Sequence, residues 1–417
     1  MRARAASFLL AAILCLAPFA TRASEGRPAD APRAEVIHWW TSGGEAAAVR
    51  TLADAYRAAG GIWVDSAIAG SEQARSVAFN RMVGGNPPTA AQFNASRQFH
   101  DMAEQGMLAD VDEVAQREGW ERVFPAPVLE AIRVGGHFYG APVGIHTPTW
   151  IWYSKAAFRK AGIEREPRSF DELFAALDRL RAAGLIPLAH GGQSWQDNLV
   201  FSAVLANVGG RDLYLRVLRD REAAAIASPQ FRKVLLDYKR LQSYVDAGSP
   251  GRNWNDATAL VISGRAGIQI MGDWAKGEFT LAHQEAGREY GCMPGIAPDA
   301  PYLIQGDVFV FPRTRDPGVQ RAQRLLASVV TSPRTQLEFA LRKGSVPVRS
   351  DVEVSRLDPC AREGARLVRE GSRQIPSVEM LLTPDQNGAL SDALTTYWNG
   401  ARPVEKVQRD IAAALAE

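Results

Sequence analysis

The fold is decided by a stretch near the amino terminus, VIHWWTSGGEAAAVRTLADAYRAAGGIWVDSAI, residues 36–68. Four of its first five residues are apolar, and Thr-Ser-Gly-Gly follows them, which is typical of a strand that ends in a loop. Residues 45–59 have helical spacing and stop at a Gly-Gly pair, and residues 62–68 are predicted to form a second strand. A helix over 74–83 and a strand over 89–93 continue the series. This β-α-β-α-β order predicts an α/β fold whose mostly parallel sheet is flanked by helices.

The middle of the chain contains an extended segment, residues 138–153, rich in β-branched and aromatic residues and interrupted by Pro142 and Pro148. Such a composition favours strand over helix, and we expect this segment to cross between two lobes. After it, we predict helices over 155–161, 170–183 (with Ser169 as the N-cap), 197–207, 229–247 and 319–342, and strands over 266–270 and 307–312.

Length and charge narrow the class of protein. The chain has 417 residues, of which 46% are hydrophobic and 23% charged, a globular profile long enough for two hydrophobic cores. It carries 48 Lys and Arg against 46 Asp and Glu, a formal net charge of +2. Binding to a phosphate backbone usually needs a clear basic excess, so a nucleic-acid partner is not expected.

The first 23 residues resemble a secretory signal. Arg2 and Arg4 precede an apolar run over 8–19, and small residues suit a cleavage site near Ser24. A membrane anchor would need about 20 apolar residues. A lipoprotein at Cys15 is disfavoured because the preceding Leu14 is large. These features predict an exported, periplasmic protein in which residues 24–34 form a polar tether. Cleavage would remove Arg2, Arg4 and Arg22 and leave 45 basic against 46 acidic residues.

Export leaves two cysteines, Cys292 and Cys360. In an oxidising compartment two such thiols more often pair than stay free, so we expect a disulfide. Neither has the CxxC spacing of a zinc or redox site, and the six histidines form no HExxH pattern. We predict no metal and no cofactor.

Candidate binding residues follow predicted strand ends. Trp39 and Trp40, with Glu45 nearby, come after the first strand, where ligands of open α/β sheets gather. Aromatic faces and a carboxylate suit a pyranose, whose C–H faces pack on rings while its hydroxyls donate to the charged oxygens. Strand alternation would point the two tryptophans to opposite faces, so at least one is expected in the core. Asp273 and Trp274 repeat the pattern after the strand over 266–270.

A third aromatic cluster comprises Trp150, Trp152 and Tyr153. Such rings could pack on a sugar, but the hydrophobic core is the commoner location for any single tryptophan. Asp307 and Lys343 lie next to glycines in predicted loops, and each alone is more often a solvated surface charge. Enzyme motifs such as GxSxG, the P-loop and a strand-linked GxGxxG were not found. A glycosidase carboxylate pair is not excluded by counting acids, but we expect a protein that is not an enzyme.

Six segments carry a family resemblance. They are HWWTSGGE (38–45), GNPPTAAQFN (85–94), YGAPVGIHTPTWIWYSKAAFRKAG (139–162), GRAGIQIMGDWAKGEF (264–279), YGCMPGIAPDAPYLIQGDVFVFP (290–312) and RKGSVPVRSDV (342–352). With them the chain resembles an extracellular, family 1 solute-binding protein of a bacterial ABC sugar importer, most closely the glucose and hexose branch.

This resemblance implies two α/β lobes joined by a hinge that closes on a ligand. Lobe 1 would comprise residues 35–144 and 304–348, and lobe 2 residues 145–303 and 349–417. The implied function is binding of a monosaccharide by a monomer that delivers it to an ABC permease and ATPase complex at the inner membrane. The implied sugar-binding residues are Trp39, Trp40, Glu45, Gln92, Asn94, His146, Trp274, Asp307 and Lys343. Asp273 is expected to hold the local turn.

The chain also departs from the resemblance. Glucose binders of this branch tend to have a lysine where Asn94 stands and a histidine soon after the equivalent of Pro376-Ser377, near Met380 here. Their glycine-rich loop is replaced by AGSEQA, residues 69–74. Other ligands therefore remain open: another hexose, a pentose, a disaccharide or a polyol. So do a sugar-sensing module for a membrane receptor and a secreted carbohydrate-active enzyme.

Overall fold

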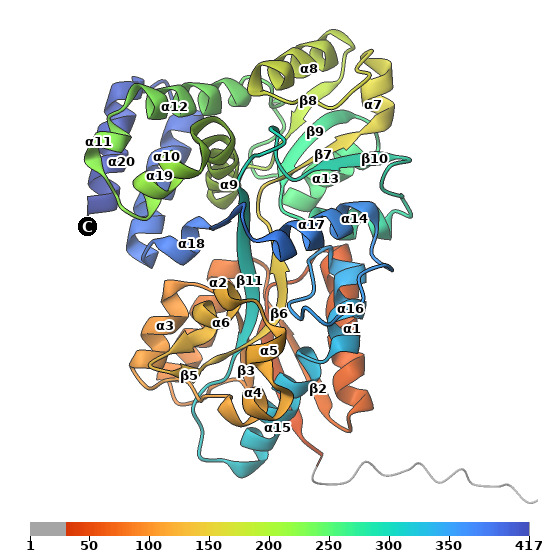
Figure 1. Ribbon diagram of the computed structural model, residues 1–417, viewed down its shortest axis with the longest axis vertical. Coiled ribbons are helices and arrows are strands. Elements are labelled where there is room, and N and C mark those ends of the chain that lie inside the picture. Colours follow the sequence, from red (N-terminus) through yellow and green to blue (C-terminus); the bar gives the residue numbers. More distant parts are fainter. Residues whose placement is uncertain (1–30, 417) are drawn as a thin grey trace, which may run out of the picture. The chain divides into compact units, whose positions relative to one another are not determined.

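The computed structural model describes residues 31–416 (Figure 1). The predicted signal peptide, its cleavage near Ser24, and Cys15 lie outside the described residues. The first strand begins earlier than predicted, so that Arg33 and Ala34 belong to the sheet and not to the tether.

Twenty α-helices and one π-helical turn (η1, Leu205–Gly209) occur within residues 31–416. The helices are α1 Gly43–Ala58, α2 Ser71–Val83, α3 Arg97–Glu104, α4 Asp112–Glu118, α5 Trp120–Val123, α6 Ala126–Ile132, α7 Lys155–Lys160, α8 Phe170–Ala182, α9 Ser194–Val204, α10 Gly210–Leu218, α11 Ala223–Ile226, α12 Pro229–Gln242, α13 Trp254–Ile262, α14 Ala275–Leu281, α15 Pro317–Val330, α16 Pro333–Lys343, α17 Pro359–Glu370, α18 Val378–Leu381, α19 Pro384–Asn399 and α20 Val404–Ala416.

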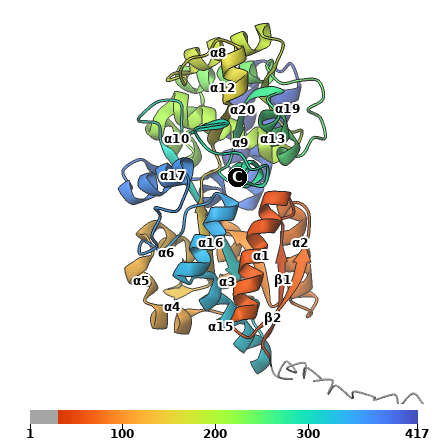
Figure 2. The ribbon, with the colours of Figure 1, turned by 90° about the vertical axis from the view of Figure 1, so that its right-hand side faces the viewer.

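The first sheet contains the predicted β-α-β-α-β opening. Its strands are β1 Arg33–His38, β2 Ile62–Ala67, β3 Ala90–Asn94, β6 Gly140–His146, β11 Tyr302–Val310 and β12 Gln374–Pro376. They are ordered β12-β11-β3-β1-β2, and β6 also pairs with β11. The pairs β1–β2, β1–β3 and β11–β12 are parallel, whereas β11 runs antiparallel to β3 and β6. Helices α1 and α16 lie side by side on one flank of this sheet (Figures 1 and 2).

The second sheet has the order β10-β7-β9-β8, with β7 Trp150–Ser154, β8 Ile186–Ala189, β9 Ala266–Met271 and β10 Tyr290–Met293. Here β8 and β9 are parallel, because helices connect them, but β7 is antiparallel to both neighbours. The α/β class is confirmed, while the expectation of a mostly parallel sheet is wrong for this second sheet. Strand β7 arrives directly from the first sheet, so its direction is not set by a β-α crossover. A separate short hairpin pairs β4 Arg133–Val134 with β5 His137–Phe138.

The predicted crossing segment is confirmed as two strands in different sheets. Strand β6 belongs to the first sheet and β7 to the second, and only residues 147–149 separate them. Strand β11 runs beside β6 and makes the return crossing (Figure 1). The two antiparallel strands therefore connect the parts of the molecule that hold the two sheets.

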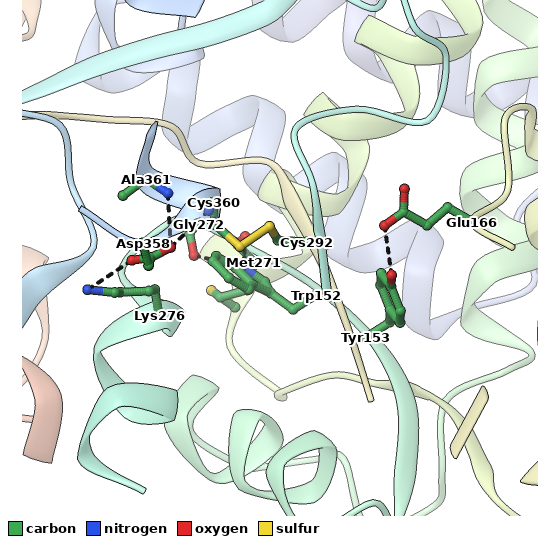
Figure 3. Close-up of a disulfide and its surroundings, with 10 residues drawn as sticks. All are labelled: Trp152, Tyr153, Glu166, Met271, Gly272, Lys276, Cys292, Asp358, Cys360 and Ala361. Atoms are coloured by element: carbon green, nitrogen blue, oxygen red, sulfur yellow. Dashed lines mark hydrogen bonds and ion pairs between the residues drawn. A yellow bond between two sulfur atoms is a disulfide. The ribbon is translucent and has the colours of Figure 1, made fainter. Parts of the chain in front are cut away.

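The predicted disulfide is confirmed between Cys292 on β10 and Cys360 on α17, with the two Cα atoms 6.1 Å apart (Figure 3). Helix α17 begins beside it because the Asp358 side chain accepts hydrogen bonds from the backbone N–H groups of Cys360 and Ala361. The same carboxylate lies 3.2 Å from Lys276 Nζ, which ties α17 to α14.

The third aromatic cluster belongs to the hydrophobic core. Trp150 and Trp152 are buried and their rings stack with centroids 5.8 Å apart, while Tyr153 stacks on Phe158. Residues 31–416 contain no helix with the length and apolar character needed to cross a bilayer.

Candidate functional site

Eight of the nine predicted site residues are joined in one network of contacts. They come from segments far apart in the chain: the loop after β1, the first turn of α1, strand β3, the end of β6, the residues after β9, strand β11 and the last turn of α16. These residues are Trp39, Glu45, Gln92, Asn94, His146, Trp274, Asp307 and Lys343.

Trp40 lies apart from this network. It is 1% exposed, and its ring packs against Phe309 at 5.8 Å and Phe339 at 5.3 Å between centroids. Trp39, the preceding residue, points elsewhere and is only half-buried. The expectation that one of the two tryptophans is in the core is confirmed, and Trp40 is that residue. A sugar-contacting role implied for Trp40 is therefore not supported by its position.

Glu45 is fixed by a capping box at the start of α1. The Ser42 hydroxyl accepts from Glu45 N at 3.3 Å, and Glu45 Oε2 accepts from Ser42 N at 3.4 Å. Its other oxygen, Oε1, lies 3.3 Å from Lys343 Nζ. Burial raises the pKa of Glu45, and the Lys343 charge opposes this shift.

Lys343 is the last residue of α16, where its positive charge interacts favourably with the negative end of the helix dipole. The following Gly344 has φ +100°, and a Cβ there would lie 2.3 Å from the Asp273 carbonyl oxygen. Only glycine allows this approach of α16 to the segment after β9. It places Lys343 Nζ 5.4 Å from the centre of the Trp274 ring while only 2% of the lysine is exposed. A buried ammonium thus lies between a carboxylate and an indole face.

Asp307 occupies the middle of the network because β11 lies between β3 and β6. Gln92 Nε2 donates to Asp307 Oδ1 at 2.9 Å, and Gln92 Oε1 accepts from Trp39 N at 3.0 Å. Asp307 Oδ2 lies 3.4 Å from His146 Nδ1, and the His146 ring is 5.4 Å from that of Trp274. Burial lowers the pKa of His146 despite the nearby Asp307, so the imidazole is neutral at neutral pH.

Several buried polar atoms of this network lack a hydrogen-bond partner among the described residues. They are Asp307 Oδ2, both ring nitrogens of His146, and Asn94 Oδ1. Buried polar groups in folded proteins are nearly always hydrogen-bonded, and leaving one unpaired costs about 1–3 kcal/mol. Donors and acceptors that converge beside two indole rings are what a polar ligand with an apolar face would satisfy.

Asp273 supports this site from behind. Its Oδ2 accepts from Thr147 N at 3.0 Å, and its own N–H donates to the Thr147 carbonyl. This reciprocal pair holds the β6–β7 connection against the segment after β9. Burial raises the pKa of Asp273 well above its ordinary value, although the Lys343 charge favours the ionised form.

Four further residues of the network were not predicted from the sequence: Arg75, Trp195, Gln305 and Glu379. Glu379 accepts from Asn94 Nδ2 at 2.6 Å and from Gln305 Nε2 at 2.8 Å. Arg75 lies 3.8 Å from the same carboxylate oxygen and 5.7 Å from the Trp39 ring centre, and Trp195 lies 6.4 Å from Trp274. Arg75 directly follows the altered segment 69–74, and Glu379 directly precedes Met380. Two of the departures from the family pattern thus lie next to residues of this network, although the sequence did not indicate which side chains take part in it.

The described residues contain no group of three or more His, Cys, Asp or Glu side chains arranged to hold a metal ion. The polar network is thus made of paired charges, amides and a neutral imidazole beside indole rings. This composition suits recognition of a solute through hydrogen bonds and ring contacts.

Comparison with known proteins agrees with this interpretation. Residues 40–330 match the model of the bacterial extracellular solute-binding proteins. The chain is 38% identical over 388 residues to a probable sugar-binding periplasmic protein of Brucella suis, covering 91% of each chain, and 37% identical over 411 residues to one of Rhizobium meliloti, covering 97% of each.

Among solved structures, a chitin oligosaccharide binding protein superposes with a TM-score of 0.80 at 18% identity, covering 93% of this chain and 98% of its own. The solute receptor AcbH, described as having an exclusive preference for β-D-galactopyranose, superposes with a TM-score of 0.76 at 17% identity, covering 91% and 97%. The superpositions support the expected two-lobed binding-protein fold. The family match and the relatives named as sugar-binding periplasmic proteins support a binding, not catalytic, role. The chain belongs to the bacterial extracellular solute-binding protein family.

Proposed function

We propose that this protein is the periplasmic substrate-binding component of an ABC importer. It binds a sugar, with glucose or a related monosaccharide as the first candidate, between two lobes and delivers it to the membrane permease and its ATPase. The observation that carries this proposal is the convergence of unpartnered buried polar atoms on Asp307, His146 and Asn94 beside indole rings.

The network has the chemistry that a sugar requires. A pyranose donates its hydroxyls to charged oxygens such as Asp307 Oδ2 and accepts from cations such as Lys343, while its C–H face packs on an indole such as Trp274. The relatives named sugar-binding periplasmic proteins support the same ligand class. The solved neighbours are described with different sugars, among them β-D-galactopyranose and maltose, so the choice of glucose rests on the family resemblance alone.

The two predicted lobes would close around the sugar because each lobe supplies residues that contact it. In the predicted division, Glu45, Asp307 and Lys343 belong to lobe 1, whereas His146 and Trp274 belong to lobe 2. A ligand that touches both sets binds the closed state more tightly than the open state, and this difference in affinity drives closure. The closed monomer is the form that a permease would recognise.

The test is isothermal titration of the mature protein, unfolded and refolded to remove any co-purified ligand. The panel contains glucose, galactose, mannose, xylose, disaccharides and polyols. Micromolar or tighter binding of one monosaccharide is expected. The sugar-binding function would be refuted if the protein bound none of these sugars. Circular dichroism and cooperative unfolding must show that the protein used is folded.

A further inference from the structure

Glu379 lies at the centre of a polar cluster beside the predicted sugar-binding residues. Asn94 and Gln305 both donate to its Oε2, and the Arg75 guanidinium lies against the same oxygen. Within residues 31–416, Oε1 takes part in no hydrogen bond and no ion pair. The side chain as a whole is 30% exposed. One oxygen of the carboxylate is therefore anchored and the other is free.

This cluster is continuous with the candidate site. Asn94 stands opposite Asp307 in the β3–β11 pairing. Asn94 Oδ1 and Asp307 Oδ2 are both buried and have no hydrogen-bond partner in the part of the chain that the structure describes. The Arg75 guanidinium reaches the Trp39 ring from the other side. Glu379 thus adds a partly exposed acceptor oxygen to an edge of the site that already has two buried ones.

The side chains at this edge differ in hydrogen-bond polarity from those that the family resemblance implies. A lysine at the position of Asn94 could only donate, whereas here the Asn94 amide donates to Glu379 and leaves its carbonyl oxygen free. Carboxylate and carbonyl oxygens only accept. A ligand group that faces Glu379 Oε1 or Asn94 Oδ1 must therefore donate a hydrogen bond, as a hydroxyl does, whereas an ether oxygen, a carboxylate or a phosphate cannot.

We propose that Glu379 is a specificity-determining residue, which accepts a hydrogen bond through Oε1 from one particular hydroxyl of a neutral sugar. Asn94, Gln305 and Arg75 position the carboxylate by holding Oε2. This proposal rests on the sugar-binding function proposed above.

The experiment combines a ligand series with a protein variant. Binding of glucose, or of the panel sugar that binds more tightly, is compared with that of its monodeoxy analogues, each lacking one hydroxyl. The titrations use the wild-type protein, Glu379→Gln and the control Glu405→Gln. Glu405 is also a glutamate paired with an arginine, Arg232 at 3.1 Å, but it lies on α20 outside the network.

In the wild type and in Glu405→Gln, one analogue is expected to bind about tenfold more weakly than the parent sugar, the loss typical of a charge-assisted hydrogen bond. Glu379→Gln is expected to bind the parent sugar about tenfold more weakly than the wild type does. In this variant, removing that same hydroxyl should reduce the affinity little further. If each analogue's affinity relative to the parent sugar is the same in all three proteins, Glu379 does not contact the ligand. The inference is then wrong, although the sugar-binding function stands. If the folded wild type binds no panel sugar, the inference is refuted together with the proposed function.

Arg75→Gln separates positioning from a structural role. We expect this variant to reduce the selective loss seen with the one deoxy analogue, while the unfolding temperature of the ligand-free protein changes little. The double variant Arg75→Gln/Glu379→Gln should bind no more weakly than Glu379→Gln alone. The positioning role would be contradicted if Arg75→Gln weakened the binding of every analogue equally and if the affinity losses of the two single variants added up in the double variant.

Discussion

At the scale of single residues, the site is defined by polar groups that folding removes from water without pairing them fully. Asp307 is 1% exposed, and only its Oδ1 is engaged, by Gln92. The neutral His146 beside Oδ2 supplies no positive charge. Such an arrangement is costly in the free protein and becomes favourable when a ligand donates to the open oxygen.

Asp307→Asn should therefore weaken sugar binding at least tenfold, because a hydrogen bond to a charged group contributes about 1.5–3 kcal/mol. Isothermal titration measures the loss. Thermal unfolding without ligand serves as the control, since the variant keeps the side-chain shape and should not unfold earlier. Unchanged affinity would remove Asp307 from the site.

Asp273 gives a pH-dependent prediction. Because its pKa is raised in the folded protein, the folded state keeps a proton that the unfolded chain releases above about pH 4, and stability falls as pH rises from there toward the folded pKa. A tenfold difference in proton affinity between the folded and unfolded states corresponds to about 1.4 kcal/mol of stability. Asp273→Asn should be the more stable protein, by a margin that grows between pH 4 and neutral pH.

Unfolding temperatures of the wild type and Asp273→Asn across this pH range measure that margin. The control is Asp54→Asn, which makes the same substitution at an exposed carboxylate paired with Arg57. A constant difference between the wild type and Asp273→Asn at all pH values would show that Asp273 is ionised in both states.

At the scale of elements, three segments of the site meet through glycines. A Cβ on Gly44 of α1 would lie 2.5 Å from the backbone carbon of Gly277 in α14, and one on Gly277 would lie 3.0 Å from the Arg342 carbonyl oxygen in α16. Gly44 N also donates to Glu278 Oε1 at 2.9 Å, so a carboxylate from α14 caps the first turn of α1. Contacts between backbones hold Glu45, Trp274 and Lys343 in register.

Gly44→Ala should disrupt this junction, because the atoms that a methyl group would meet belong to the backbone and cannot rotate away. We expect sugar affinity to fall at least tenfold in titration. The matched control is Gly388→Ala in α19, where a Cβ meets nothing within 4 Å. That change should stabilise the protein by up to about 1 kcal/mol and leave binding intact. Equal affinity in both variants would rule out close packing as a condition of binding.

Local sequence patterns predicted the elements well where neighbouring residues determine them. The opening β-α-β-α-β series, the crossing strands and the Ser169 cap of α8 all follow from spacing and capping residues. The antiparallel direction of β7 could not be predicted, because it depends on where the chain enters the second sheet. The helical region predicted over 319–342 consists of two helices, α15 and α16, and Ser332 caps the second one ahead of Pro333.

The site was predictable only as far as the family pattern reaches. Eight of nine residues converge, but Trp40 is in the core, since spacing alone could not tell which of the two tryptophans faces inward. Glu379 and Arg75 were missed because neither fits a local motif. Their meeting is a tertiary contact between distant parts of the chain.

At the scale of the whole molecule, the chain passes between its two sheets along β6 and returns along β11, and the Cys292–Cys360 bond joins residues on either side of that second passage. The bond spans a sequence separation of 68 residues. A cross-link over such a loop removes conformational freedom from the unfolded chain.

Replacing both cysteines by serine should lower the free energy of unfolding by about 2–4 kcal/mol. Denaturant titration of the oxidised wild type and the double variant measures the difference. Adding reductant should shift the wild-type midpoint toward that of the variant and leave the variant unchanged. Coincident midpoints without reductant would mean that the bond does not stabilise the fold.

The same bond turns part of the backbone into a covalent ring, which runs from Cys292 to Cys360 and contains β11, α15 and α16. The loop between β11 and α15 carries exposed residues, among them Arg313 and Arg315, that a trypsin-like protease can reach. A single cut there would separate Asp307 from Lys343 along the chain and yet leave them in one molecule. The nicked protein would migrate as one band without reductant and as two with it.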